Sequence, residues 1–113
     1  MRRLVGVTVG LTVCGVMGSA PVWAYDGKQL YEKNCVTCHG AAGKGDGPAA
    51  KAMKTKPQDF AVGLKGKSDA DITKTLKEGV VGAEGKATHP KMTKLSDDQL
   101  QSMIKYVKQL AAQ

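Results

Sequence analysis

Cys35-Val36-Thr37-Cys38-His39 places two thiols three residues apart and an imidazole directly after the second thiol. Cys-x-x-Cys-His is the pattern of covalent haem attachment. Two thiols at this spacing can reach the two vinyl groups on neighbouring edges of one porphyrin, and the next residue then lies under the ring, near the iron. The motif therefore predicts one haem c, attached through Cys35 and Cys38, with His39 as an axial iron ligand.

Other chemistries use the same residue types. A redox-active dithiol is expected in a βαβ setting, and the sequence shows no such pattern. A zinc site needs four ligands, and the available set is Cys35, Cys38, His39 and the distant His89, in which the adjacent Cys38 and His39 make the geometry awkward. Two free cysteines without a function are a third alternative, which leaves a small domain without a stabilising group.

The N-terminus has the three-part layout of a secretory signal peptide. Met1-Arg2-Arg3 is positively charged, residues 4–18 are uncharged and mostly apolar, and Val22-Trp23-Ala24 stands where a signal peptidase reads. The apolar stretch is shorter than the about 20 residues of a membrane span. We therefore expect residues 1–24 to be a signal peptide and residues 25–113 to be one haem-binding domain, with an uncleaved anchor as the alternative.

Cleavage after Ala24 leaves 89 residues, a length that buries little apolar surface and usually needs a disulfide, metal or cofactor for stability. Cys14 lies in the leader and is expected to be removed with it; lipid attachment at Cys14 is the alternative. The other two cysteines are too close together in the sequence to form a disulfide that closes a long loop. In bacteria haem is attached outside the cytoplasmic membrane, so the leader agrees with the motif and predicts a periplasmic protein.

The residues after the leader are basic. The chain has 17 Lys and Arg against 10 Asp and Glu, and because both arginines lie in the leader, 15 lysines remain, spread along the chain. Such a surface keeps a protein soluble, and it can also steer association with an acidic partner. We expect redox partners with acidic docking faces and a monomeric chain that is soluble or loosely membrane-associated. Nucleic acid is not expected, because no basic run is interleaved with aromatics.

Three segments predict helices. The first runs from about Asp26 to Asn34 and leads into Cys35, with apolar and aromatic residues at three- and four-residue spacing. The second starts at the capping-box sequence Ser68-Asp69-Ala70-Asp71 and ends near Gly79. The third starts at a second capping box, Ser96-Asp97-Asp98-Gln99, and carries an apolar stripe.

Glycines and prolines predict loops over residues 40–67 and 82–93, with a short helix over residues 49–54. No segment alternates as a strand does. The fold class is therefore all-α, with three main helices, and loops this long in so small a domain need something to wrap around.

The sequence resembles the class I cytochrome c family. Gly27-Lys28-Gln29-Leu30-Tyr31-Glu32-Lys33-Asn34-Cys35 is similar to the family's first helix, in which the glycine lets the first and last helices cross closely. Met103 and Tyr106 stand where the last helix supplies matching apolar and aromatic residues. The resemblance implies a small all-α cytochrome c fold wrapped around one covalently attached haem.

Two loop segments, Gly45-Asp46-Gly47-Pro48-Ala49-Ala50 and Lys56-Pro57-Gln58-Asp59-Phe60, are also similar to segments of bacterial members. The resemblance implies that the Pro48 carbonyl accepts a hydrogen bond from His39, which would fix the imidazole tautomer. The alternative for Pro48 is an ordinary turn proline.

The family's sixth iron ligand is a methionine upstream of the last helix, and Met92 lies in that interval. Most relatives continue with proline and a longer segment, whereas here Thr93 follows. His89 is the rival ligand, and an open iron site is a third alternative. Met53 is expected in the core near the haem and Met103 in the buried stripe of the last helix.

The resemblance implies an exported monohaem c-type cytochrome that carries single electrons between redox partners in the periplasm and is not an enzyme. One alternative is the cytochrome subunit of a larger respiratory or dehydrogenase complex. A second alternative is a ligand-binding or peroxidatic haem protein with an open iron site.

Overall fold

The computed structural model describes Gly10, Gly15 and residues 25–113; the rest of the predicted signal peptide, including Cys14, lies outside the described residues. In chain order the elements are α1 (Gly27–Asn34), α2 (Val36–His39), the 3-10 helix η1 (Pro48–Ala52), α3 (Phe60–Gly63), α4 (Asp69–Glu78), β1 (Val80–Val81), β2 (Ala87–His89) and α5 (Asp97–Ala111). The fold is mostly helical, as the sequence predicts. None of the helices in this described part is long and apolar enough to cross a membrane.

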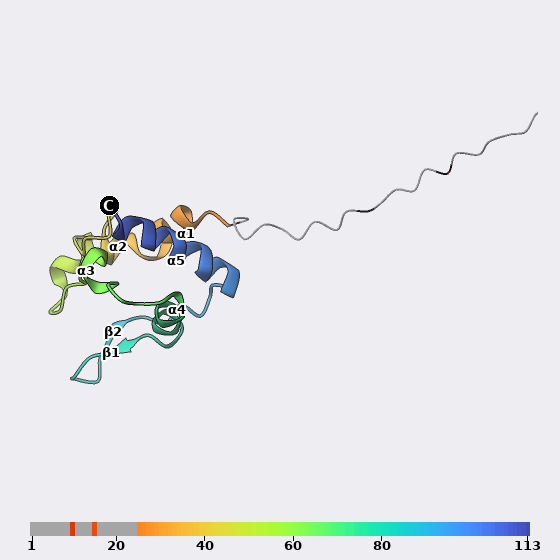
Figure 1. Cartoon of the computed structure of the whole chain (residues 1–113). Helices are drawn as coiled ribbons and strands as arrows, with labels where there is room; N and C mark the ends of the chain where they lie inside the picture. Colours follow the sequence, from red (N-terminus) through yellow and green to blue (C-terminus); the bar gives the residue numbers. More distant parts are fainter. Residues whose placement is uncertain (1–9, 11–14, 16–24) are drawn as a thin grey trace, which may run out of the picture.

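Helix α5 is the centre of the arrangement. It packs against α1, α3 and α4, and α2 packs against η1. Figure 1 shows α3 near the C-terminal end of α5, and α4 with the β1–β2 hairpin lying below α5. The three predicted helices are thus the ones that define the framework.

The beginnings of α4 and α5 are capped as predicted. Ser68 Oγ accepts a hydrogen bond from the backbone N–H of Asp71 at 3.1 Å, and the Asp71 carboxylate accepts one from the Ser68 N–H at 2.9 Å. Ser96 and Gln99 form the same reciprocal pair at 3.2 and 2.9 Å. Each pair satisfies two of the backbone donors that the first turn leaves without an intrahelical partner.

Helices α1 and α5 cross at a glycine. A Cβ added at Gly27 would overlap the backbone carbonyl oxygen of Ser102 and would lie 3.2 Å from the Tyr106 Cβ. The ring of Tyr106 also lies 5.5 Å from the ring of Tyr31, measured between centroids. The close helix crossing that the family resemblance implies is therefore confirmed.

The core lies between these helices. Its least exposed large side chains, each about 1% exposed, come from one residue of α1 and three of α5: Tyr31, Leu100, Met103 and Ile104. The burial of Met103 confirms its predicted place in the stripe of the last helix. Met53 is only half-buried and borders an open cavity, so the core position expected for Met53 is only partly realised.

Two short elements interrupt the predicted loops. Phe60–Gly63 forms the single turn α3, begun by the Asp59 side chain, which accepts a hydrogen bond from the Ala61 N–H at 2.9 Å. Residues 80–89 form a small antiparallel hairpin, in which Val80 lies opposite His89. The prediction of a plain loop over residues 82–93 is therefore wrong at β2, because the strand depends on pairing with the valines that follow α4.

Candidate haem-attachment site

The Cys-x-x-Cys-His motif occupies one hydrogen-bonded turn. Helix α1 ends at Cys35, whose N–H donates to the Tyr31 carbonyl at 2.8 Å. The Cys35 carbonyl then accepts hydrogen bonds from the N–H groups of Cys38 at 3.2 Å and His39 at 2.9 Å. Helix α1 therefore leads directly, through the buried Cys35, into the turn that carries both thiols and the imidazole.

Both thiols are free. Cys35 is buried, with its sulfur 3.8 Å from the Met103 sulfur, whereas Cys38 is half-buried. Burial, with a smaller effect of Cys38, raises the pKa of the Cys35 thiol to about 11. Cys35 is therefore a protonated thiol at neutral pH, and it is not poised as a redox-active thiolate.

The loop after the motif is tied back to it. The N–H of Gly45 donates to the His39 carbonyl at 2.8 Å, and the N–H of Gly47 donates to the Cys38 carbonyl at 3.1 Å. The Tyr31 hydroxyl donates to the Gly40 carbonyl at 2.5 Å. A Cβ at Gly47 would collide with backbone carbonyls of the motif turn, so only glycine permits this approach.

His39 is a half-buried imidazole that stacks on Phe60, with ring centroids 4.8 Å apart and planes 27° apart. Burial, and secondarily the nearby His89, lowers the pKa of His39. Its Nδ1 is buried without a hydrogen-bond partner among the described residues. A neutral imidazole beside two free thiols is the donor set that haem c requires, so the residues present fit this cofactor.

Pro48 begins η1, which packs on α2, and its side chain is exposed. Because the His39 Nδ1 has no partner in the described part of the chain, the hydrogen bond to the Pro48 carbonyl is not formed there. The role of Pro48 stays a prediction.

The two sixth-ligand candidates lie three residues apart, one at the end of the hairpin and one just after it. His89 ends β2, and its ring centroid lies 6.0 Å from that of His39, with the planes 45° apart. Met92 is half-buried and packs against the core cluster, and its N–H donates to the Leu76 carbonyl at 2.7 Å. The structure therefore brings His89 to His39 and anchors Met92 to α4.

Sequence reasoning gave no role to Phe60, which stacks on His39, or to the Tyr31 hydroxyl. The segment containing Phe60 was recognisable by its resemblance to bacterial relatives. Its contact with His39, however, arises from tertiary packing: the Phe60 N–H donates to the Gly43 carbonyl at 2.9 Å, which joins α3 to the loop that follows the motif.

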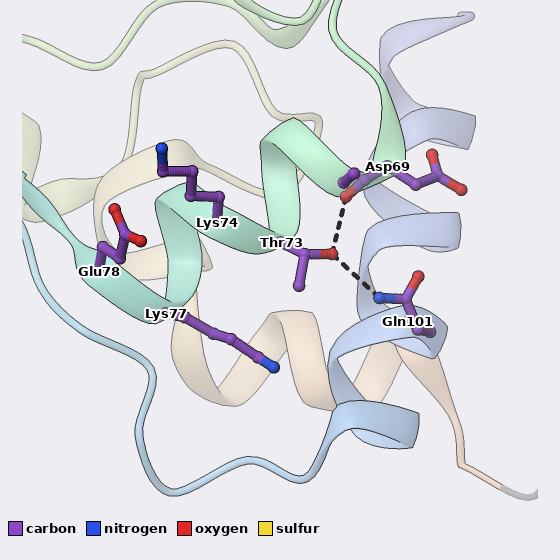
Figure 2. A pocket seen from close by; sticks show the side chains of 7 residues that line it. Asp69, Thr73, Lys74, Lys77, Glu78 and Gln101 are labelled. Atoms are coloured by element: carbon purple, nitrogen blue, oxygen red, sulfur yellow. Dashed lines mark hydrogen bonds between the residues drawn. The ribbon is translucent and has the colours of Figure 1, made fainter.

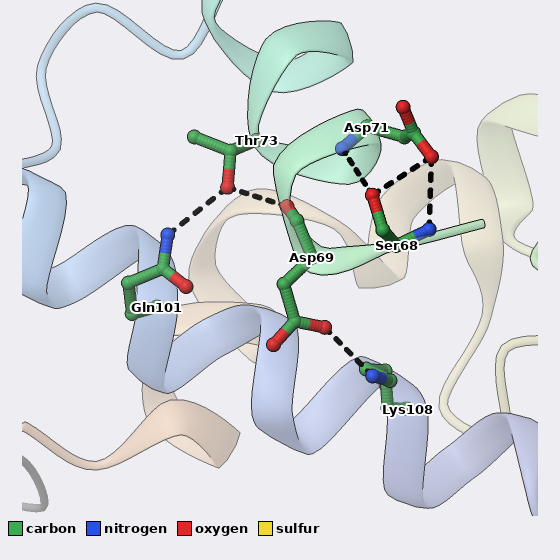
Figure 3. Close-up of polar contacts among 6 residues, drawn as sticks. All are labelled: Ser68, Asp69, Asp71, Thr73, Gln101 and Lys108. Atoms are coloured by element: carbon green, nitrogen blue, oxygen red, sulfur yellow. Dashed lines mark hydrogen bonds and ion pairs between the residues drawn. The ribbon is translucent and has the colours of Figure 1, made fainter.

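A pocket of about 550 Å³ lies away from the motif, between α4 and α5 (Figure 2). At its edge the Thr73 hydroxyl donates to the Asp69 carbonyl at 2.7 Å and accepts from the Gln101 amide at 3.0 Å. Figure 3 shows these bonds together with the Lys108–Asp69 ion pair, whose nitrogen and oxygen are 2.7 Å apart. These contacts hold α4 against α5.

A zinc site of the kind weighed from the sequence is not assembled in the described residues. They contain no group of three or more histidine, cysteine or acidic side chains that could hold a metal ion. Haem needs fewer protein ligands, because the porphyrin supplies the remaining iron ligands.

Comparison with known proteins agrees with this site. The family model described as Cytochrome c matches residues 24–111. The chain therefore belongs to the cytochrome c family, and membership implies covalently bound haem c and electron transport.

Two curated relatives are cbb3-type cytochrome c oxidase subunits CcoP from Azospirillum sp. (strain B510) and Azospirillum brasilense. Each is 39% identical over 59 residues, which is 52% of this chain and 18% of the relative. A chain of the reducing HAO-like protein complex of Kuenenia stuttgartiensis is similar in structure, with a TM-score of 0.64 and 30% identity over 75% of this chain. This chain spans 41% of that one, so it corresponds to a part of each relative.

Proposed function

We propose that the protein is an exported monohaem c-type cytochrome that carries single electrons between redox partner proteins. The observation that carries the proposal is the single turn on which Cys35, Cys38 and His39 meet, with both thiols free and the imidazole half-buried. When bound, haem supplies a one-electron exchange between ferric and ferrous iron. One attachment motif in the sequence supports one haem.

Each residue of the motif has a distinct task. Cys35 and Cys38 supply the sulfurs of the two thioether links, one from the buried core and one from the half-buried side of the turn. His39 supplies the fifth iron ligand; desolvation keeps it neutral and leaves a nitrogen lone pair available. Phe60 restricts the orientation of the imidazole by stacking on it. Pro48 is our candidate acceptor for the His39 N–H in the loaded protein.

We take Met92 as the candidate sixth ligand. Its backbone is anchored to Leu76 of α4, and its side chain is half-buried against the core. A thioether opposite a histidine raises the reduction potential relative to two histidines. Two protein ligands leave no open position for a substrate, which favours a carrier over an enzyme.

The carrier proposal is tested by redox titration of the haem-loaded protein. We expect a one-electron transition. We also expect carbon monoxide to bind the reduced protein only by displacing one of the two protein ligands of the iron. Carbon monoxide binding to a vacant iron position would favour the ligand-binding or peroxidatic alternative. The 15 lysines would attract a partner with an acidic docking face. Because salt screens this attraction, the rate of electron exchange with such a partner should fall as salt is added.

A second candidate function is a cytochrome subunit of a larger redox complex. It is favoured by the relatives, because one is described as an oxidase subunit and another belongs to a multi-protein complex. Purification from the native host under mild conditions separates the two: a free carrier elutes as one small chain, whereas a subunit elutes with other chains.

Export is proposed from the leader over residues 1–24. A mature chain that begins at Tyr25 in the periplasmic fraction would support this proposal. Haem-loaded protein that retains residues 1–24 in the membrane fraction would favour the uncleaved anchor.

A further inference from the structure

The candidate haem site contains a second imidazole besides that of the attachment motif. His89 is half-buried at the end of β2, and its ring centroid lies 6.0 Å from that of His39. An imidazole nitrogen binds a first-row metal at about 2 Å and lies about 1.1 Å from its own ring centre. Two imidazoles on opposite sides of one metal ion therefore have ring centres about 6 Å apart, which agrees with the separation of these two rings.

The angle between the rings is also compatible with shared coordination. The two planes are inclined by 45°. Each plane of a coordinated imidazole contains its own metal–nitrogen bond, and the ring can rotate about that bond. Trans imidazoles can therefore adopt any angle between parallel and perpendicular.

The hydrogen bonding of His89 leaves its other nitrogen ready to coordinate a metal. The Nδ1 of His89 lies 2.8 Å from the Pro90 carbonyl oxygen. A carbonyl oxygen only accepts hydrogen bonds, so Nδ1 is the donor of this pair, and Nε2 is the nitrogen left to bind a metal. A second hydrogen bond of this kind on a ligand histidine fixes the tautomer and the ring orientation.

The backbone around His89 is held in place by the segment that follows α4, Gly79 and strand β1. Val80, two residues after α4, pairs with His89 in the hairpin, and Thr88 donates its hydroxyl to the Val80 carbonyl at 3.3 Å. A Cβ at Gly79 would come within 2.7 Å of the His89 carbonyl oxygen, which shows how closely the two segments approach. His89 is therefore presented toward His39 by a paired strand.

We propose that His89 binds the ferric iron opposite His39, in competition with Met92 three residues further on. The inference rests on the proposed haem site and concerns its sixth ligand. Imidazole nitrogen is a harder donor than thioether sulfur, so His89 is favoured on ferric iron and Met92 on ferrous iron. In the ferric protein the exchange replaces one iron–sulfur bond with one iron–nitrogen bond at unchanged oxidation state.

The test is the optical spectrum of the ferric, haem-loaded protein, read at the weak long-wavelength band that arises from methionine sulfur bound to ferric iron. We expect the wild-type protein to be low-spin without this band. His89→Ala should gain the band and show a higher reduction potential, because Met92 takes the position. Met92→Ala should keep the low-spin ferric spectrum of the wild type. Lys86→Ala, an exposed residue of the same hairpin just before β2, is the matched control and should leave the ferric ligands unchanged.

A full sulfur-to-iron band in the wild-type ferric protein, unchanged in His89→Ala, would overturn the inference. The wild-type spectrum alone decides this point, so a variant that fails to fold does not hide the answer. Absence of covalent haem in the wild type is a different outcome, and it would overturn the proposed function itself.

Discussion

The Gly27→Ala substitution is expected to destabilise the haem-loaded protein, because α1 and α5 cross at this residue. The added Cβ would overlap the Ser102 carbonyl oxygen, which belongs to the α5 backbone and cannot rotate away. Overpacking of a core costs about 1–3 kcal/mol, and replacing a helical glycine by alanine otherwise stabilises by about 0.5–1 kcal/mol. The midpoints of these two ranges leave a net loss of about 1 kcal/mol.

Thermal unfolding followed by circular dichroism measures this loss. For a domain of this size it corresponds to a fall in the melting temperature of roughly 4–8 °C. Gly63→Ala is the matched control: it lies in α3, and its added Cβ would meet only Cβ and Oε1 of Gln58, both at 3.3 Å, so a shift of a few tenths of an ångström relieves the contact. Gly63→Ala should leave the melting temperature unchanged or slightly raised. A Gly27→Ala protein as stable as the control would refute the close crossing.

The remaining predictions concern single hydrogen bonds and ion pairs. Tyr31→Phe removes the bond to the Gly40 carbonyl and should cost about 1 kcal/mol in urea unfolding; an unchanged midpoint would contradict this contribution. Burial raises the pKa of Tyr31, so the folded protein keeps the hydroxyl proton at a pH where the unfolded chain has lost it. The free energy of unfolding should therefore fall as the pH rises past about 10. The fall should be smaller in Tyr31→Phe, which lacks this hydroxyl. Ser96→Ala should cost about 1 kcal/mol by uncapping α5, and an equal stability would refute the capping box. Lys108→Ala should cost less than about 1 kcal/mol because its ion pair with Asp69 is exposed, and a larger loss would mean that the pair orders α4.

The helix framework could be predicted because its signals are local. The serines of the two capping boxes, Ser68 and Ser96, lie within three residues of the groups that they bond, and they set the starts of α4 and α5. The attachment motif is equally local, since Cys35, Cys38 and His39 share one turn.

The contacts of the imidazole could not be predicted, because they depend on packing between distant segments. Phe60 reaches His39 through α3, and His89 reaches it through pairing with Val80. A two-residue strand such as β1 is too short to leave an alternating pattern. Both sixth-ligand candidates, Met92 and His89, could therefore be named from the sequence. The distance between the His39 and His89 rings could not, because it depends on the hairpin.

The proposed electron transfer depends on haem held covalently through the two cysteines of the motif, Cys35 and Cys38. The most direct measurement is the intact mass of the protein, produced alongside the bacterial haem-attachment machinery and extracted with acidified acetone. We expect a mass increase of one haem that survives extraction, with stable loading lost in both Cys35→Ala and Cys38→Ala. A wild-type chain that loses its haem on extraction, or normal two-thioether haem in either variant, would show that haem is not held in this way.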